Sequence, residues 1–159
     1  MTRVRLAEGS GMRIIVVLAC AFLCPAVARA QSPSVDAGAC DRLAGALTLT
    51  NATVTATHMV AAGQFVPPAT GSAAPPAAMT NLPAFCRVRL TLRPSSDSDI
   101  KSEVWLPVSG WNGKFQQVGN GAFAGSIQYG ALADALRRGY AAASTDAGHT
   151  GAGAAWAAA

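Results

Sequence analysis

The sequence predicts an α/β fold in which an antiparallel hairpin leads into a βαβ unit. Residues 87–93 alternate between apolar and polar side chains, and residues 100–107 return as a second strand after the turn-forming run SSDSD. The apolar residues Ala131, Leu132, Ala135 and Leu136 have helical spacing, and short runs at 115–119 and 140–145 lie on either side of them as strands. A strand, a helix and a second strand in this order form the βαβ unit.

The first thirty residues have the pattern of a secretory signal peptide. Met12 offers a second possible start, and the chain then has Arg13, an apolar run over 14–27 and an Ala-Arg-Ala cleavage site at 28–30. A membrane anchor is the alternative. Because the run is shorter than the about 20 residues that span a bilayer and is interrupted by Pro25, we expect cleavage after residue 30, a secreted or periplasmic location and no membrane partner afterwards.

Removal of this leader changes the charge balance. The whole chain has 12 basic and 8 acidic residues, a net charge of +4, whereas residues 31–159 keep 8 basic and 7 acidic residues, a net charge of +1. The remaining arginines and lysines sit singly or alternate with apolar residues, which argues against a nucleic-acid surface. His58 and His149 lie far apart and neither is near a cysteine, so no spacing typical of metal ligands is found.

Residues 31–86 are expected to form an N-terminal segment. After a polar lead-in over 31–39, the Thr- and Val-rich residues 47–57 alternate with period two and favour a strand. Residues 67–83 are rich in Pro, Ala and Gly and predict a surface loop. The rest, residues 87–159, is expected to be the first part of an α/β domain. It ends in the run GAGAAWAAA, without a cap or closing strand, which predicts that the chain is part of a longer protein.

The elements of the second part follow in order. The strand over 87–93 is expected to have one solvated face, with these residues on the polar side: Arg87, Arg89, Thr91 and Arg93. Asn112-Gly113 marks a turn before the third strand, and Trp105 and Trp111 are expected to be core or sheet-edge aromatics. In the helix, Asp134 and Arg138 have the spacing of an i,i+4 pair, and Gly139 occupies the C′ position.

The cysteines divide between the leader and the remaining chain. Cys20 and Cys24 leave with the leader, whereas Cys40 and Cys86 remain. An even pair in an oxidising compartment favours one disulfide, and separate partners in a longer chain are the alternative. In the chain-entropy model, closing this loop stabilises the fold by about 3–4 kcal/mol.

The stretch FQQVGNGAFAGSI, residues 115–127, breaks from a strand into a glycine-rich turn. Residues 119–124 match the G-x-G-x-x-G/A fingerprint of dinucleotide-binding domains, with Asp146 as the acid that follows. Three features argue against a nucleotide: the export signal, the hairpin that precedes the motif, and the distance of the acid from Gly121, which exceeds the usual spacing of about 20 residues. The second interpretation is an oxyanion loop, in which small residues let a substrate carbonyl approach a backbone N–H to about 3 Å.

The order of elements agrees with the second interpretation, because α/β-hydrolases place a glycine-rich oxyanion loop between their third strand and first helix. Three stretches then resemble the tannase and feruloyl esterase family: NLPAFCRVRLTLRPSSDSDIKSEVWLP, GWNGKFQQVGNGAFAGSI and RGYAAASTDAGHTG. The resemblance covers the chain from Cys40 onward. It implies the N-terminal part of an α/β-hydrolase fold, incomplete and ending before the nucleophile elbow. It also implies a secreted serine esterase that cleaves esters of hydroxy-aromatic acids.

The resemblance assigns roles to the glycine loop. It implies that Gly121 offers an oxyanion-hole N–H, that Gly119 and Asn120 shape the loop, and that Phe123 is the aromatic able to line the acyl pocket. The family usually reads G-N-G-G, and Ala122 here departs from that pattern. The family also pairs an N-terminal cysteine with the cysteine of its FCRV stretch, which implies a Cys40–Cys86 bridge.

The rest of the machinery is expected beyond this chain. The family's nucleophilic serine, its acid and histidine, and its lid with a calcium site come later, so this chain by itself is expected to be inactive and to hold no cofactor or metal. No G-x-S-x-G motif occurs in the sequence. Ser144, Asp146 and His149 lie too close together at one strand end to build a triad, and we interpret them as structural.

Two other functions remain open on the sequence alone. One is a small exported binding or structural module, in which the glycine loop serves only packing. The other is a nucleotide-binding α/β domain. For the esterase hypothesis, the partner of the full-length form is a small aromatic ester.

Overall fold

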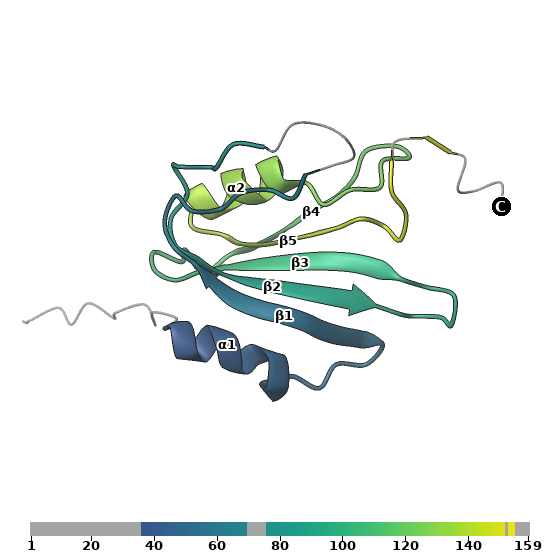
Figure 1. The fold of residues 1–159 in the computed structure, drawn as a ribbon, viewed down its shortest axis with the longest axis horizontal. Coiled ribbons are helices and arrows are strands. Elements are labelled where there is room, and N and C mark those ends of the chain that lie inside the picture. Colours follow the sequence, from purple (N-terminus) through teal and green to yellow (C-terminus); the bar gives the residue numbers. More distant parts are fainter. Residues whose placement is uncertain (1–35, 70–75, 152, 155–159) are drawn as a thin grey trace, which may run out of the picture. The chain divides into compact units, whose positions relative to one another are not determined.

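The computed structural model describes residues 36–69, 76–151, 153 and 154. They form a five-stranded mixed sheet with helices packed against it (Figure 1). The predicted signal peptide, residues 1–30, lies outside the described residues. In chain order the elements are α1 (Ala37–Ala46), β1 (Ala52–Val60), β2 (Phe85–Leu92), β3 (Ile100–Pro107), β4 (Phe115–Val118), α2 (Tyr129–Arg137) and β5 (Ala141–Thr145).

The strands lie in the order β1-β2-β3-β5-β4, and only the β4–β5 pair is parallel. This order confirms the predicted α/β class, with the hairpin β2–β3 leading into the unit β4–α2–β5. The predicted turn at Asn112 is also present, because its Oδ1 accepts a hydrogen bond of 2.9 Å from the amide of Lys114 and Gly113 has φ +80°. It closes no hairpin, however, because β5 lies between β3 and β4.

Helix α1 is absent from the sequence prediction, which starts a strand at residue 47. Asp36 caps the helix, because its carboxylate accepts a hydrogen bond from the amide of Ala39 at 2.5 Å. A disulfide between Cys40 and Cys86 then joins the helix to β2, at positions 46 residues apart in the chain. The strand begins only at Ala52, after a turn in which Asn51 has φ +57°.

Two apolar clusters lie on the two faces of the sheet. The pleat of β2 directs alternate side chains to opposite faces, so that Cys86 and Val88 pack with α1, whereas Phe85 packs on the side of α2. On the α2 side, the ring of Trp105 lies 4.3 Å from that of Phe85 and 4.6 Å from that of Phe65, measured between centroids. Burying aromatic side chains of this size stabilises the fold by about 2–3 kcal/mol each.

The loop between β1 and β2 contributes to the second cluster. It supplies the buried side chains of Phe65 and Leu82, and its two ends are tied by hydrogen bonds from Gly63 N to Leu82 O and from Met79 N to Phe65 O, at 3.0 and 2.8 Å. No helix or strand is found in its described parts, as the Pro/Ala-rich composition predicts. The loop therefore covers the aromatic core with irregular backbone.

Helix α2 confirms the predicted periodicity. Its buried residues are Leu132, Ala133, Ala135 and Leu136. The helix ends at Arg137, and Gly139 follows its C-cap with φ +78° and an amide that donates to the carbonyl of Leu136 at 2.9 Å. The predicted ion pair is wrong in one member: Asp134 pairs with Arg137 at 2.6 Å, in the i,i+3 arrangement, whereas Arg138 Nε donates to the Asp134 carbonyl.

The polar face of β2 is not solvated along its length, which corrects the sequence prediction. The side chain of Arg87 is 12% exposed and Thr91 is 5% exposed, whereas Arg89 and Arg93 are exposed. An alternating pattern shows which side chains share a face and does not show what covers that face. Here, the inner end of the face lies beside α2 and the aromatic cluster.

Candidate functional site

The glycine turn follows the carboxyl end of β4, next to the carboxyl end of the parallel strand β5. This edge is where open α/β sheets bind their ligands. A Cβ added at Gly119 or at Gly121 would meet no heavy atom within 4 Å, so the space around both residues is open. The amide of Ala124 donates to the carbonyl of Gly121 at 3.0 Å and closes a four-residue turn.

Ala122 adopts a backbone conformation that favours glycine. It is the first central residue of this turn and has φ +49°. A left-handed conformation costs an ordinary residue about 1–2 kcal/mol, which gives a physical reason for a glycine at this position. The residue is exposed, so the turn tolerates the alanine without burying its methyl group.

The side chain of Asn120 holds the loop to the sheet. Its Nδ2 donates to the carbonyl of Thr145, at the end of β5, at 2.8 Å. Its Oδ1 accepts from Nε2 of Gln128, just before α2, at 3.1 Å. The side chain of Asn120 thus connects β5 to the start of α2. The neighbouring residues, Gly119 and Gly121, are exposed.

The backbone amides of Gly121 and Ala122 donate no hydrogen bond to any acceptor among the described residues. Both residues are exposed. Adjacent N–H groups at the carboxyl edge of a sheet can donate to an anion or to a developing negative charge. The turn is therefore a candidate oxyanion site.

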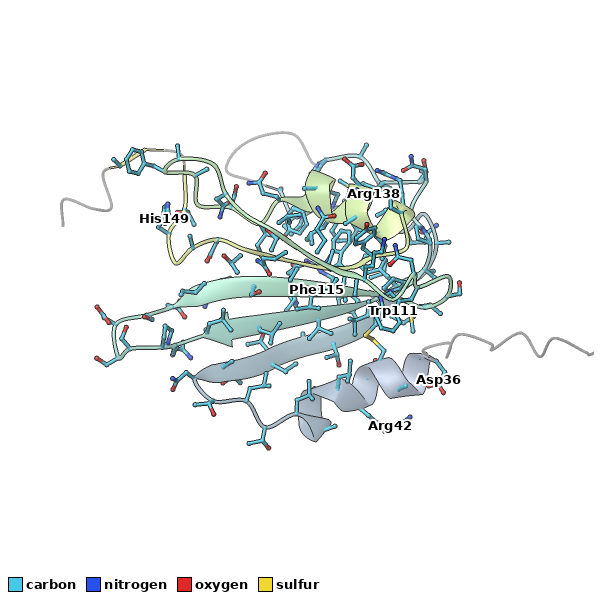
Figure 2. All side chains as sticks on the ribbon, turned by 180° about the vertical axis from the view of Figure 1, so that it is seen from behind. Asp36, Arg42, Trp111, Phe115, Arg138 and His149 are labelled. Atoms are coloured by element: carbon cyan, nitrogen blue, oxygen red, sulfur yellow. A yellow bond between two sulfur atoms is a disulfide. The ribbon has the colours of Figure 1, made fainter. Side chains whose placement is uncertain are left out.

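The loop after β5 lies against the glycine turn. His149 Nε2 lies 3.0 Å from the carbonyl oxygen of Phe123, and Gly125 and Gly151 exchange two backbone hydrogen bonds of 2.7 and 3.3 Å. Figure 2 shows His149 at the end of the sheet opposite the disulfide. The side chain of His149 and the backbone hydrogen bonds between Gly125 and Gly151 therefore join the loop after β5 to the glycine turn.

Ser144, Asp146 and His149 do not form a catalytic triad in this structure. Ser144 is fully buried and its hydroxyl accepts from the amide of Gln128 at 3.0 Å. Asp146 Oδ1 accepts from the amides of Lys101 and Gly148, each at 2.9 Å. These contacts are with backbone groups, in agreement with the structural roles expected for the three residues.

The same contacts weigh against a nucleotide site. The Asp146 carboxylate is engaged by the backbone of its own loop and of β3. Helix α2 begins at Tyr129, five residues after the fingerprint run 119–124, whereas a dinucleotide fold opens its helix directly at the glycines. The helix N-terminus that would receive a pyrophosphate is thus displaced from the motif.

A buried ion pair close to the site is absent from the sequence prediction. Glu103, only 2% exposed, accepts from Nε of Arg87 at 2.8 Å and again from its Nη2. Nε1 of Trp105 donates to the same carboxylate at 2.9 Å and the hydroxyl of Tyr129 at 3.2 Å. The network joins β2 and β3 to the first residue of α2.

This network changes two pKa values. Burial alone would lower the pKa of Arg87, but the hydrogen bonds and negative charge of Glu103 outweigh it and raise that pKa. Burial, followed by the charge of Glu103, raises the pKa of Tyr129 to about 12. Both shifts favour the protonated forms of Arg87 and Tyr129, which donate to Glu103.

An open hollow of about 1210 Å³ adjoins this network on the α2 face of the sheet. One wall is the segment from Ala124 to Tyr129, and the floor is polar, with Arg89, Lys101 and Ser102. Phe123, the predicted acyl-pocket aromatic, is 54% exposed and is not part of this wall. Trp105 is buried as expected, and Trp111 is 46% exposed near β4.

No group of three or more His, Cys, Asp or Glu side chains within the described ranges could hold a metal ion. In the part of the chain that the structure describes, neither α1 nor α2 is long and apolar enough to span a membrane.

Comparison with known proteins identifies the fold's relatives. Residues 86–159 match the sequence profile of the family described as "Tannase and feruloyl esterase". The chain belongs to the tannase and feruloyl esterase family. The match includes the glycine turn, α2, β5 and the loop that carries His149.

Several members of the tannase and feruloyl esterase family resemble the chain over most of its length. An uncharacterized esterase of Xanthomonas campestris pv. campestris is 48% identical over 116 residues, which are 73% of this chain and 19% of the relative. A probable feruloyl esterase B-1 of Aspergillus oryzae is 35% identical over 117 residues, 70% of this chain and 21% of the relative. The chain thus spans about a fifth of the length of these relatives.

Solved structures agree with the sheet described above. The crystal structure of feruloyl esterase B from Aspergillus oryzae superposes with a TM-score of 0.60 at 34% identity and covers 73% of this chain and 22% of that one. The crystal structure of an esterase from Aspergillus oryzae gives a TM-score of 0.64 at 29% identity, over 73% and 23% of the two chains. The mixed α/β sheet therefore matches one part of feruloyl esterase structures.

Proposed function

We propose that this chain supplies the oxyanion loop of a serine carboxylic-ester hydrolase that acts on esters of hydroxy-aromatic acids. The observation that carries the proposal is the pair of amides at Gly121 and Ala122, which donate to no acceptor among the described residues and lie at the carboxyl edge of a family-matched α/β sheet. Family membership supports the ester-hydrolase class, and the names of the feruloyl esterases among the relatives support the hydroxy-aromatic substrate.

In this proposal the chain stabilises charge and does not attack the substrate. A serine from another part of the full-length enzyme adds to the ester carbonyl, whose oxygen becomes negatively charged. The N–H of Gly121 donates to that oxygen, and Asn120 and Gly119 keep the loop in place. The alcohol then leaves, and water releases the acid from the acyl-serine. One donor of this kind contributes about 10²–10³-fold to kcat.

The remaining expectations are part of the same proposal. We infer an exported protein, whose residues 1–30 are a signal peptide, 31–86 an N-terminal segment and 87–159 the first part of the hydrolase domain. The Cys40–Cys86 disulfide supports an oxidising compartment, because such bonds persist outside the cytosol.

A hybrid enzyme tests the function. The aligned segment of the Xanthomonas esterase is replaced by the matching segment of this chain, and hydrolysis of p-nitrophenyl acetate, methyl ferulate and methyl gallate is measured. We expect Gly121→Pro, which removes the N–H, to lower kcat by about 10²–10³-fold. Gly121→Ala is the matched control, since it keeps the N–H and a Cβ at this position meets nothing within 4 Å.

Three results would contradict the proposal, the third of which is an inactive hybrid. One is equal activity of the Pro and Ala variants in a hybrid that is folded by circular dichroism. Another is turnover of methyl ferulate by the isolated 159-residue chain, because the proposal places the nucleophile elsewhere. A folded but inactive hybrid would favour a binding or structural module.

A further inference from the structure

The peptide group between Phe123 and Ala124 is held at both of its polar atoms. Its carbonyl oxygen lies 3.0 Å from His149 Nε2. Its N–H donates to the carbonyl of Gly121 at 3.0 Å. A carbonyl oxygen can only accept, so this contact is a hydrogen bond when the ring carries a proton on Nε2. The other ring nitrogen, Nδ1, lies 3.4 Å from the carbonyl oxygen of Ala147, which is a longer contact.

The backbone leaves this histidine little freedom to move away. A Cβ built on Gly125 would lie 2.3 Å from the carbonyl oxygen of His149 and 2.5 Å from its ring carbon Cδ2. Only a glycine permits this approach, in which the backbone and ring of His149 lie directly against the end of the turn. The Gly125–Gly151 ladder holds the two loops in this register.

The loop that carries His149 is itself anchored to the sheet. Asp146 Oδ1 accepts from the amide of Lys101 on β3 and from the amide of Gly148, at 2.9 Å each. The amide of Asp146 donates in return to the carbonyl of Lys101 at 3.0 Å. A rigid path therefore runs from β3 through this loop to the glycine turn.

We propose that His149 is a positioning residue for the oxyanion turn, a role that rests on the proposed function. By donating to Phe123 O, it fixes the orientation of the peptide that closes the turn. The two preceding amides, of Gly121 and Ala122, then keep their directions toward the charge that develops on the substrate. Preorganised donors of this kind act mainly on the transition state and less on the bound ester.

Kinetics of the hybrid esterase distinguish this role from simple structural support. We expect His149→Ala to lower kcat by about 10- to 100-fold with KM changed less than threefold, since misplacement of a reacting group by about 1 Å can cost 10²-fold. Affinity for a trifluoromethyl ketone, which forms an oxyanion, should fall in parallel with kcat. His149→Gln, which keeps an N–H donor, and added imidazole with His149→Ala should each restore part of the rate.

His58→Ala is the matched control, because His58 lies in β1, at the opposite edge of the sheet from β4 and the glycine turn. It should leave kcat unchanged. If His149→Ala lowers only the melting temperature, or raises KM while kcat stays constant, the positioning role is overturned. If the hybrid with His149 intact is inactive, the proposed function fails, and the role is then judged by a measurement that needs no activity.

That measurement is amide hydrogen exchange in the 159-residue chain. His149→Ala should speed exchange at Ala124 and Gly125 by about 5- to 10-fold, as expected for loss of one hydrogen bond. Exchange in the β2–β3 hairpin should not change. Equal rates at Ala124 with and without the histidine, or no protection at Ala124 in the parent chain, would show that His149 does not hold the turn.

Discussion

Replacing Glu103 by glutamine tests the buried ion pair that joins the hairpin to α2. The carboxylate receives hydrogen bonds from Arg87, Trp105 and Tyr129 and is 2% exposed. The amide has nearly the same shape, but its NH2 group faces donors and it carries no charge to offset the guanidinium. Removing one partner of such a pair costs about 3–5 kcal/mol. Because the side chain of Arg87 keeps 12% exposure, we expect the lower end, about 3 kcal/mol.

The assay is urea unfolding of the chain, followed by tryptophan fluorescence and far-UV circular dichroism. With an m value of about 1.5 kcal/mol/M for a chain of this size, the midpoint should fall by about 2 M. The double variant Arg87→Met with Glu103→Leu removes both charges and should regain most of the loss, because apolar replacements of a whole buried pair are close to neutral.

An exposed pair provides the control. Asp134→Asn breaks the surface contact with Arg137 and should change stability by less than about 1 kcal/mol. If Glu103→Gln is as mild as Asp134→Asn, the carboxylate is not the centre of a desolvated network. The same conclusion follows if the double variant is no more stable than the single one.

Three further predictions concern the site. Ala122→Gly should raise the free energy of unfolding by about 0.5–1 kcal/mol, because it relieves the φ of +49°, and urea midpoints measure this gain. Gly125→Ala should lower that free energy by more than about 2 kcal/mol through its overlap with His149, whereas Gly130→Ala, where a Cβ meets nothing within 4 Å, should stabilise α2 by up to about 1 kcal/mol. The raised pKa of Tyr129 adds stability that is complete below pH 10 and is lost as the pH rises to about 12. Tyr129→Phe should therefore flatten the alkaline fall in urea midpoints, and an unchanged slope would contradict the assignment.

The hairpin, α2 and β5 could be predicted because each rests on a local pattern. Alternation in residues 87–93 and the turn SSDSD define the hairpin without any distant contact. The apolar spacing of α2 and the glycine at position 139 define both the helix and its end. The sequence of elements then limits the fold to a hairpin followed by a βαβ unit.

Helix α1 and the strand order depend on contacts that no local pattern contains. Two glycines, Gly38 and Gly45, lower the helix propensity of α1, and its fixed position comes from the Cys40–Cys86 disulfide and from packing on β2. Asp36 was the available signal, as an N-cap before a short run of helix-compatible residues. The place of β5 between β3 and β4 is decided by pairing across the sheet.

The candidate site divides in the same way. The glycines at 119 and 121 are visible in the sequence because open backbone at a strand end needs small residues. The donor to Phe123 O comes from His149, which lies 26 positions further along. The ion pair between Arg87 and Glu103 likewise joins two adjacent strands. The alternating sequence pattern of a strand is the same whether its polar face is covered by water or by a helix, so the pattern could not reveal that this pair is buried.

The place of β4 in the sheet has a consequence for the chemistry. It is the outermost strand, only four residues long and paired on one side within the described residues, with Phe115 60% exposed. The glycine turn follows directly after this strand. Among the described residues, the rigidity of the turn at this end therefore depends on a short strand that pairs only with β5. We therefore expect a strand that pairs with the second edge of β4 to hold the amides of the glycine turn more firmly. In the hybrid esterase, a substitution at Phe115 should therefore lower kcat more than it raises KM.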